Sequence, residues 1–108
     1  MRELPIKSIL LKDLIPKTFL EIFEGVPQTK IRRETLTRGI DIVTALSHET
    51  GFFNSKGEAR RALNENSISV NQSKVTIDYS IGIKDLIANQ YVLIQRGKRN
   101  YFVLRIDD

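Results

Sequence analysis

The 108-residue sequence contains no cysteine and no tryptophan, and it has a single histidine. Without cysteine, it can form neither a disulfide nor a thiolate metal site. No apolar run approaches the roughly twenty residues that a membrane span needs, and the apolar stretch Ile9–Leu11 is too short for a signal peptide. We therefore expect a cytoplasmic protein. The length is about that of one domain, which is enough to bury a core without cross-links.

Motifs of catalysis are missing as well. The sequence has no G-x-x-x-x-G-K-[ST] phosphate loop, no G-x-S-x-G elbow and no clustered set of histidine, cysteine and carboxylate side chains. His48 falls in the last turn of an expected helix, with no second ligand or nucleophile to join. We therefore predict no catalytic residue, no metal ligand and no cofactor in this chain, which leaves a binding function.

Positive charge gathers toward the C-terminal half. The formal net charge is +4 and the pI is about 9.6, but residues 1–53 carry eight Lys or Arg against seven Asp or Glu. From Arg96 to Arg105 there are four cations and no acid. A local surplus of one sign is typical of a phosphate-binding surface, although solubility alone is the alternative explanation.

The clearest local signal is the start of a helix at Lys56. Ser55 and Glu58 have the S-x-x-E spacing of a capping box, in which each side chain satisfies a backbone N–H at the other position. The small apolar residues that follow at helical spacing predict the buried face of this helix: Ala59, Ala62 and Leu63.

The cations of this helix fall into two groups. Lys56 and Arg60, four residues apart, have no acid at helical spacing, so we interpret them as anion contacts. Arg61 lies within reach of both Glu58 and Glu65, so a surface ion pair explains it equally well.

Strand patterns follow this helix. Residues 67–70 alternate between polar and apolar, which predicts a half-buried strand, and 71–74 read as a turn in which Asn71 tolerates left-handed geometry. Residues 75–77 are expected to form the partner strand. A hairpin of 91–95 and 101–106 then closes the chain, and its turn carries three cations: Arg96, Lys98 and Arg99. A solvated loop is one explanation for them; contact with RNA or phosphate is the one that we favour.

The N-terminal half is expected to be helical with interruptions. Residues 9–15 and 16–25 are predicted as short helices, the second with an apolar face and Gly25 as its stop. Residues 28–38 are predicted as a surface connector with at most a short helical turn near Glu34. Asp41 is expected to cap a helix that ends at Gly51.

The order of a capped basic helix, an I-S-V-N strand, a basic turn and a paired strand resembles the S4 RNA-binding family. That resemblance implies an α+β fold of the αL type, in which two short helices pack on a small, bent, mostly antiparallel sheet. The resemblance can be narrowed to one group of proteins. Along roughly residues 20 to 107, four segments in the same order resemble the C-terminal region of bacterial tyrosyl-tRNA synthetases: EIFEGVPQ, GIDIVTAL, GFFNSKGEARRAL and YVLIQRGKRNYFVLRI.

The resemblance implies a division of the chain and a partner. Residues 1–38 would be a linker from a catalytic domain absent from this sequence, and residues 39–108 the S4-like domain, preceded by short linker helices. The domain would dock tRNA(Tyr) through its anticodon region and long variable arm, while the absent domain uses ATP and forms the homodimer. This chain by itself would be a monomer without enzyme activity.

Carried over by position, the RNA-binding residues would be Ser55, Lys56, Arg60, Arg61, Asn71, Lys74, Arg96, Lys98 and Arg99. One departure concerns the turn after the strand, because the family usually has glycine where this chain has Gln72. A non-glycine residue in a left-handed position costs about 1 kcal/mol, which leaves the type of this turn open.

Two other functions fit the same residues. A free-standing S4 module that binds ribosomal RNA would show the same basic surface. A structural or protein-interaction domain would instead dock through the apolar face of the second N-terminal helix, which consists of Phe19, Leu20 and Phe23. Those side chains are more simply explained as core.

Overall fold

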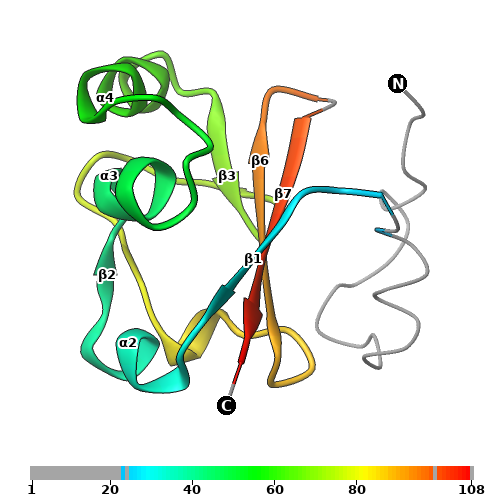
Figure 1. Ribbon diagram of the computed structural model, residues 1–108. Coiled ribbons are helices and arrows are strands. Elements are labelled where there is room, and N and C mark those ends of the chain that lie inside the picture. Colours follow the sequence, from blue (N-terminus) through cyan, green and yellow to red (C-terminus); the bar gives the residue numbers. More distant parts are fainter. Residues whose placement is uncertain (1–22, 24, 99, 108) are drawn as a thin grey trace.

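The computed structural model describes residue 23 and residues 25–98 and 100–107 of the chain. Within them, five strands form one sheet in the order β1-β7-β6-β3-β4 (Figure 1). β1 runs parallel to β7, and the other neighbours are antiparallel, so the expected mostly antiparallel α+β fold is confirmed. The strands are β1 (Gln28–Ile31), β3 (Ile68–Val70), β4 (Ser73–Lys74), β6 (Tyr91–Arg96) and β7 (Asn100–Ile106).

The centre of the sheet is buried on both faces. Val92 and Ile94 of β6 belong to the larger core, which lies between the sheet and the helices. Leu93 and Tyr91 alternate with them and belong to a second, smaller cluster. The predicted closing hairpin is therefore confirmed, and β6 reads as an unbroken apolar run because both of its faces are covered.

The helices lie on one side of this sheet (Figure 1). They are α2 (Arg33–Arg38), α3 (Ile42–Thr44) continued by the π-helical turn η2 (Ala45–Glu49), and α4 (Lys56–Asn64). Asp41 caps α3 as predicted, since its carboxylate accepts the N–H of Thr44 at 3.1 Å. Gly51, with φ +69°, follows the end of η2.

The capping of α4 is confirmed in part. The Ser55 hydroxyl accepts the N–H of Glu58 at 3.2 Å. The Glu58 carboxylate accepts from the N–H of Asn54 at 3.3 Å, one residue before the position that a reciprocal box requires. Two backbone donors at the helix start are satisfied either way.

The prediction of a surface connector over residues 28–38 is wrong. Residues 28–31 form an edge strand whose register with β7 pairs Lys30 with Arg105, and α2 buries Leu36 in the larger core beside Ile31. The fold therefore includes residues on both sides of the expected boundary at residue 39. The short helical turn expected near Glu34 is present and is six residues long.

A second, two-stranded sheet was also missed. β2 (Ile40–Asp41) pairs antiparallel with β5 (Ser80–Ile81), and the 3-10 turn η3 (Ile83–Asp85) follows. These strands have two residues each, too few for an alternating pattern to be read from sequence.

The turn after β3 is tighter than predicted. The partner strand is β4 at 73–74 and not 75–77, so the connection consists of Asn71 and Gln72 alone. Both have positive φ, +49° and +72°, as in the type I′ turns that join two-residue hairpins. The left-handed geometry expected of Asn71 is confirmed, and Gln72 adopts it without being glycine.

Most of the expected N-terminal helices lies outside the described residues, including the whole of 9–15 together with Phe19 and Leu20. Phe23 is fully buried in the second cluster, as expected of a core residue. Gly25 has φ +84°, the left-handed geometry of a helix stop.

The turn geometry predicts that Gln72→Gly stabilises the protein. Glycine removes the cost of a side chain at positive φ, so we expect the free energy of unfolding to rise by about 0.5 to 1 kcal/mol. Chemical denaturation measures it. The opposite substitution, Gly97→Ala at φ +64°, should destabilise by a similar amount, and a loss of stability in Gln72→Gly would contradict the assignment.

Candidate nucleic-acid interface

The predicted cations of α4 all face solvent. Ala59, Ala62 and Leu63 are buried against the core, which turns the opposite side of the helix outward. Arg61 is exposed on that side, and Lys56 and Arg60 are exposed on one flank of the buried face. The helix thus presents three positive charges within about one and a half turns.

The closing hairpin is tied to the C-terminal end of this helix. Ser67 follows α4, and its N–H and its hydroxyl both donate to the carbonyl of Ala62, at 3.2 and 2.8 Å. The carbonyl of Ser67 in turn accepts the N–H of Gly97 at 2.9 Å. The hairpin turn and α4 therefore lie at the same end of the molecule (Figure 1).

A hollow between the two elements brings Arg61 and Arg96 together. Its lining also includes Phe53, and the guanidinium carbon of Arg96 lies 5.0 Å from the centroid of that ring. This cation–π contact holds Arg96 at the base of the hairpin. Two arginines that are 35 positions apart in the sequence thus border one surface. We call α4 and the hairpin turn, with Lys56, Arg60, Arg61, Arg96 and Lys98, the α4–hairpin surface.

The surface ion pair that was one of two explanations for Arg61 is not formed with a described residue. Lys84 and Asp85 make the only ion pair between two described residues, although Glu58 and Glu65 line the same hollow as Arg61. The Arg61 guanidinium therefore makes no ion pair with a described residue, but the two nearby carboxylates reduce the positive potential around it.

The other predicted site residues have different positions. Lys74 is exposed on the edge strand β4, in register with Ser69, and Ser69 alternates with side chains that pack under the helices. Lys74 therefore lies on the sheet face turned away from α4. Ser55 is the helix cap, and Arg99 lies outside the described residues.

Asn71 is half-buried, and its side-chain oxygen, its side-chain nitrogen and its backbone N–H are all hydrogen-bonded. Its amide oxygen accepts the N–H of Leu93 at 2.9 Å, and its amide nitrogen donates to the carbonyl of Asp85 at 2.6 Å. Its own N–H donates to the carbonyl of Leu93 at 2.7 Å. The side chain thus fixes the β3–β4 turn to the central strand and to η3.

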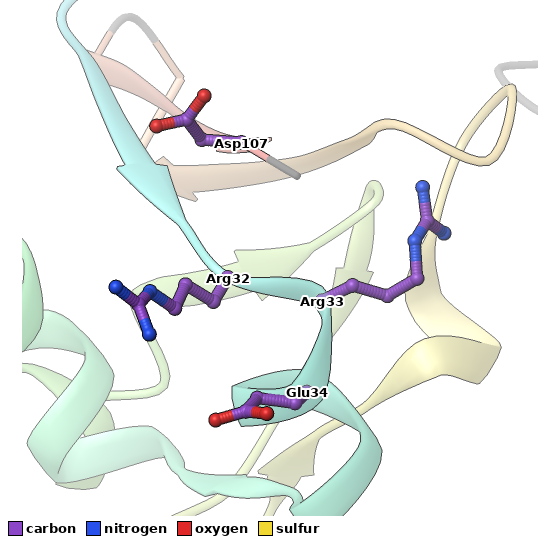
Figure 2. Close-up of a pocket in the computed structure, with 4 residues that line it drawn as sticks. All are labelled: Arg32, Arg33, Glu34 and Asp107. Atoms are coloured by element: carbon purple, nitrogen blue, oxygen red, sulfur yellow. The ribbon is translucent and has the colours of Figure 1, made fainter.

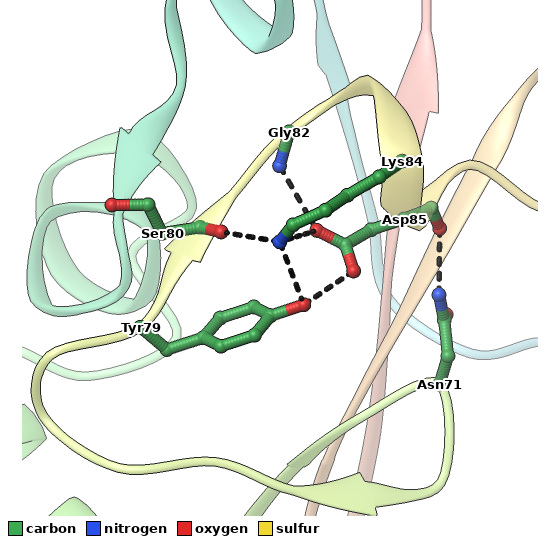
Figure 3. Close-up of polar contacts among 6 residues, drawn as sticks. All are labelled: Asn71, Tyr79, Ser80, Gly82, Lys84 and Asp85. Carbon is green, nitrogen blue, oxygen red and sulfur yellow. Dashed lines mark hydrogen bonds and ion pairs between the residues drawn. The ribbon is translucent and has the colours of Figure 1, made fainter.

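A polar cluster around Asp85 supports this arrangement (Figure 3). The buried carboxylate accepts from the Tyr79 hydroxyl, from the N–H of Gly82 at 3.0 Å and from Lys84 Nζ at 3.5 Å. Lys84 Nζ also donates to the Tyr79 oxygen at 3.3 Å and to the Ser80 carbonyl at 3.2 Å. Sequence reasoning missed this cluster because its members follow no helical or strand period.

The cluster raises two pKa values. Burial, followed by the hydrogen bond to Asp85, raises the pKa of Tyr79. The hydrogen bond to Tyr79 is the main cause that raises the pKa of Lys84. At neutral pH the phenol is therefore protonated and the ammonium charged, the states that the hydrogen bonds require.

The described residues contain no group of three or more side chains suited to a metal ion. In the same part of the chain, no helix is long and apolar enough to cross a membrane.

Comparison with known proteins decides the family. The family model of the tyrosine–tRNA ligase SYY-like C-terminal domain matches residues 18–104. The chain belongs to this family. The resemblance drawn from the sequence is confirmed, and the helices on a mixed sheet are the S4-like fold of these C-terminal domains.

Curated relatives agree with the family model. The chain is 58% identical over 96 residues to the tyrosine–tRNA ligase of Flavobacterium johnsoniae. It is 40% identical over 95 residues to that of Bacteroides thetaiotaomicron and 35% identical over 98 residues to that of Porphyromonas gingivalis. These matches cover 87 to 90% of this chain but only 22 to 23% of the relatives. The chain thus spans about a fifth of their length.

In this SYY-like C-terminal domain, we expect Asn71→Ala to lower stability. It leaves the N–H of Leu93 unpaired and places alanine at positive φ, so the loss should be about 2 to 4 kcal/mol. Asn71→Gly, which keeps the turn accessible, should lose about 1 kcal/mol less. Thermal or urea unfolding measures both, and unchanged stability in Asn71→Ala would contradict the structural role.

The polar cluster around Asp85 predicts a loss of stability at alkaline pH. Both folded-state pKa values lie above the ordinary ones of 10.0 and 10.5, so the folded protein holds protons that the unfolded chain has released. The contribution is present below about pH 10 and is lost as the pH rises through the folded-state values. Unfolding midpoints should fall more steeply above about pH 10 than those of Tyr79→Phe. Parallel pH profiles for the two proteins would exclude this linkage.

Proposed function

We propose that this chain is the part of a tyrosine–tRNA ligase that docks tRNA(Tyr), and that it does so through the α4–hairpin surface. The single observation that carries the proposal is the convergence of α4 and the hairpin turn at one end of the molecule, joined by the Gly97–Ser67 hydrogen bond. The family supports a tRNA-related role, since its members are C-terminal domains of these ligases.

Phosphate groups are the ligands that this surface fits best. Lys56 and Arg60 are exposed and make no ion pair with a described residue. Lys98 extends the positive charge onto the hairpin turn. Cations spread over a helix and a turn suit a nucleic-acid backbone, where phosphate contacts position the protein and the shape of the RNA supplies specificity.

The remaining site residues take supporting roles in this proposal. Asn71 builds the β3–β4 turn, Ser55 starts the helix that carries the cations, and Arg96 is held over Phe53. Lys74 is a separate contact on the other face of the sheet, and Arg99 is proposed as a further contact from its place in the sequence alone. ATP-dependent activation of tyrosine, and dimerisation, belong in this proposal to the remainder of the ligase, which acts in the cytoplasm.

The proposal predicts the effect of Lys56→Ala combined with Arg60→Ala. Removing two phosphate contacts should weaken binding of tRNA(Tyr) about tenfold at low salt, and should reduce the slope of log K against log salt by about 1.5. Gel-shift or filter binding across a salt series measures both values.

The control is Arg38→Glu, which removes the same two units of charge from the end of α2, away from this surface. It should bind nearly as well as the wild type. Equal binding by the double variant, or binding that is insensitive to salt, would contradict the proposal. Stronger competition by a ribosomal RNA stem than by tRNA(Tyr) would favour the free-standing S4 module instead.

A further inference from the structure

A second group of cations lies at the other end of the sheet. Lys30 of β1 and Arg105 of β7 are register partners on adjacent parallel strands, and both are exposed. Neighbouring strands are roughly 4.8 Å apart, and like charges directly opposite each other destabilise a sheet. Neither side chain makes an ion pair with a described residue that would offset this repulsion.

Arg33 brings a third charge to the same end. Its guanidinium donates to the side-chain oxygen of Asn89 at 3.0 Å and to the Asn89 carbonyl at 3.2 Å. The next residue, Gln90, accepts the N–H of Ile106 at 2.8 Å, which places this loop beside the end of β7. Figure 2 shows Arg33 extending toward the loop and Arg32 extending the opposite way. We call Lys30, Arg33 and Arg105 the β1–β7 cationic end.

The described acids at this end are fewer than the cations. Asp107 follows β7 and, with Glu34, Arg32 and Arg33, lines a shallow hollow at this end (Figure 2). Neither acid is paired with Lys30 or Arg105. Among the described residues at this end, four cations outnumber the two acids, so their summed charge is positive: Lys30, Arg32, Arg33 and Arg105 against Glu34 and Asp107.

This end is distinct from the α4–hairpin surface. Arg105 lies five positions along β7 from Asn100, or about 17 Å in an extended strand. Arg105 is in register with Tyr91, which belongs to the cluster on the sheet face away from the helices. The two groups of cations therefore point in different directions from opposite ends of the sheet.

We propose that the β1–β7 cationic end binds the phosphate backbone of a second segment of the same tRNA. This rests on the proposed function only in taking tRNA as the partner. The neighbouring exposed side chains, Gln28, Asn89 and Gln90, are neutral hydrogen-bonding groups that suit phosphate and ribose. Protein interfaces need apolar anchors at their centre, and the exposed large apolar side chain of the described residues, Ile83, lies in η3.

The test is Lys30→Gln combined with Arg105→Gln in the 108-residue chain, with tRNA(Tyr) as the probe. Loss of two phosphate contacts should weaken binding about tenfold at low salt and reduce the salt slope by about 1.5. Arg38→Glu, with the same change in net charge, is the control and should change binding less than about twofold. Because these exposed side chains make no ion pair with a described residue, the midpoints of unfolding should not fall.

Combination with Lys56→Ala and Arg60→Ala separates this proposal from the proposed function. If both surfaces hold one tRNA, the effects of the two double variants should multiply, to about a hundredfold. Wild-type affinity in Lys30→Gln/Arg105→Gln, alongside a tenfold loss in the α4 variant, would overturn the second surface and leave the first intact. The same result is expected if Lys30 and Arg105 instead bind an acidic protein partner.

Discussion

The register of β6 between β3 and β7 is the constraint on which the rest of the structure depends. β6 pairs with β7 along its full length and with β3 through Val70 and Ile94. A shift by one residue would turn Val92 and Ile94 out of the larger core and turn Leu93 into it. The same register sets the distance between the hairpin turn and α4, because it brings Gly97 to the carbonyl of Ser67. The surface proposed to bind RNA is thus a consequence of core packing.

Local signals were sufficient for the elements that build this surface. The start of α4 and the cap at Asp41 each depend on residues three positions apart, and the closing hairpin depends on two strand patterns joined by a short turn. Spacing alone therefore predicted them. Family resemblance added the fold, and the match over residues 18–104 confirmed it. What the cations bind is still a prediction, because exposure and charge are compatible with more than one RNA.

Pairing between distant segments could not be predicted from the sequence. β1 is a polar, basic edge strand whose parallel partner lies about 75 residues later, and it has no alternating pattern because only Ile31 is buried. The β3–β4 turn was placed two residues too long, because Gln72 lacks the glycine that usually marks a type I′ turn. Spacing left an ion pair and an anion contact equally open for Arg61, because helical spacing permits such a pair without requiring it.

Buried polar contacts explain why Asn71 and Asp85 matter although neither carries charge to the surface. Asn71 ties the turn to β6, and the Asp85 cluster ties η3 to β5 and Tyr79. A polar residue that the sequence presents as a contact for RNA can therefore be a structural one. Only its hydrogen-bond partners distinguish the two roles, and these come from segments 14 and 22 residues away.

The most direct test of the central claim is an NMR titration of the chain with tRNA(Tyr), in which amide shift changes are mapped residue by residue. The account predicts that the largest changes fall in α4 and in residues 96–98, and that those at Lys56 and Arg60 diminish as salt is added. Changes confined to other elements, with α4 and the hairpin turn unaffected, would contradict it.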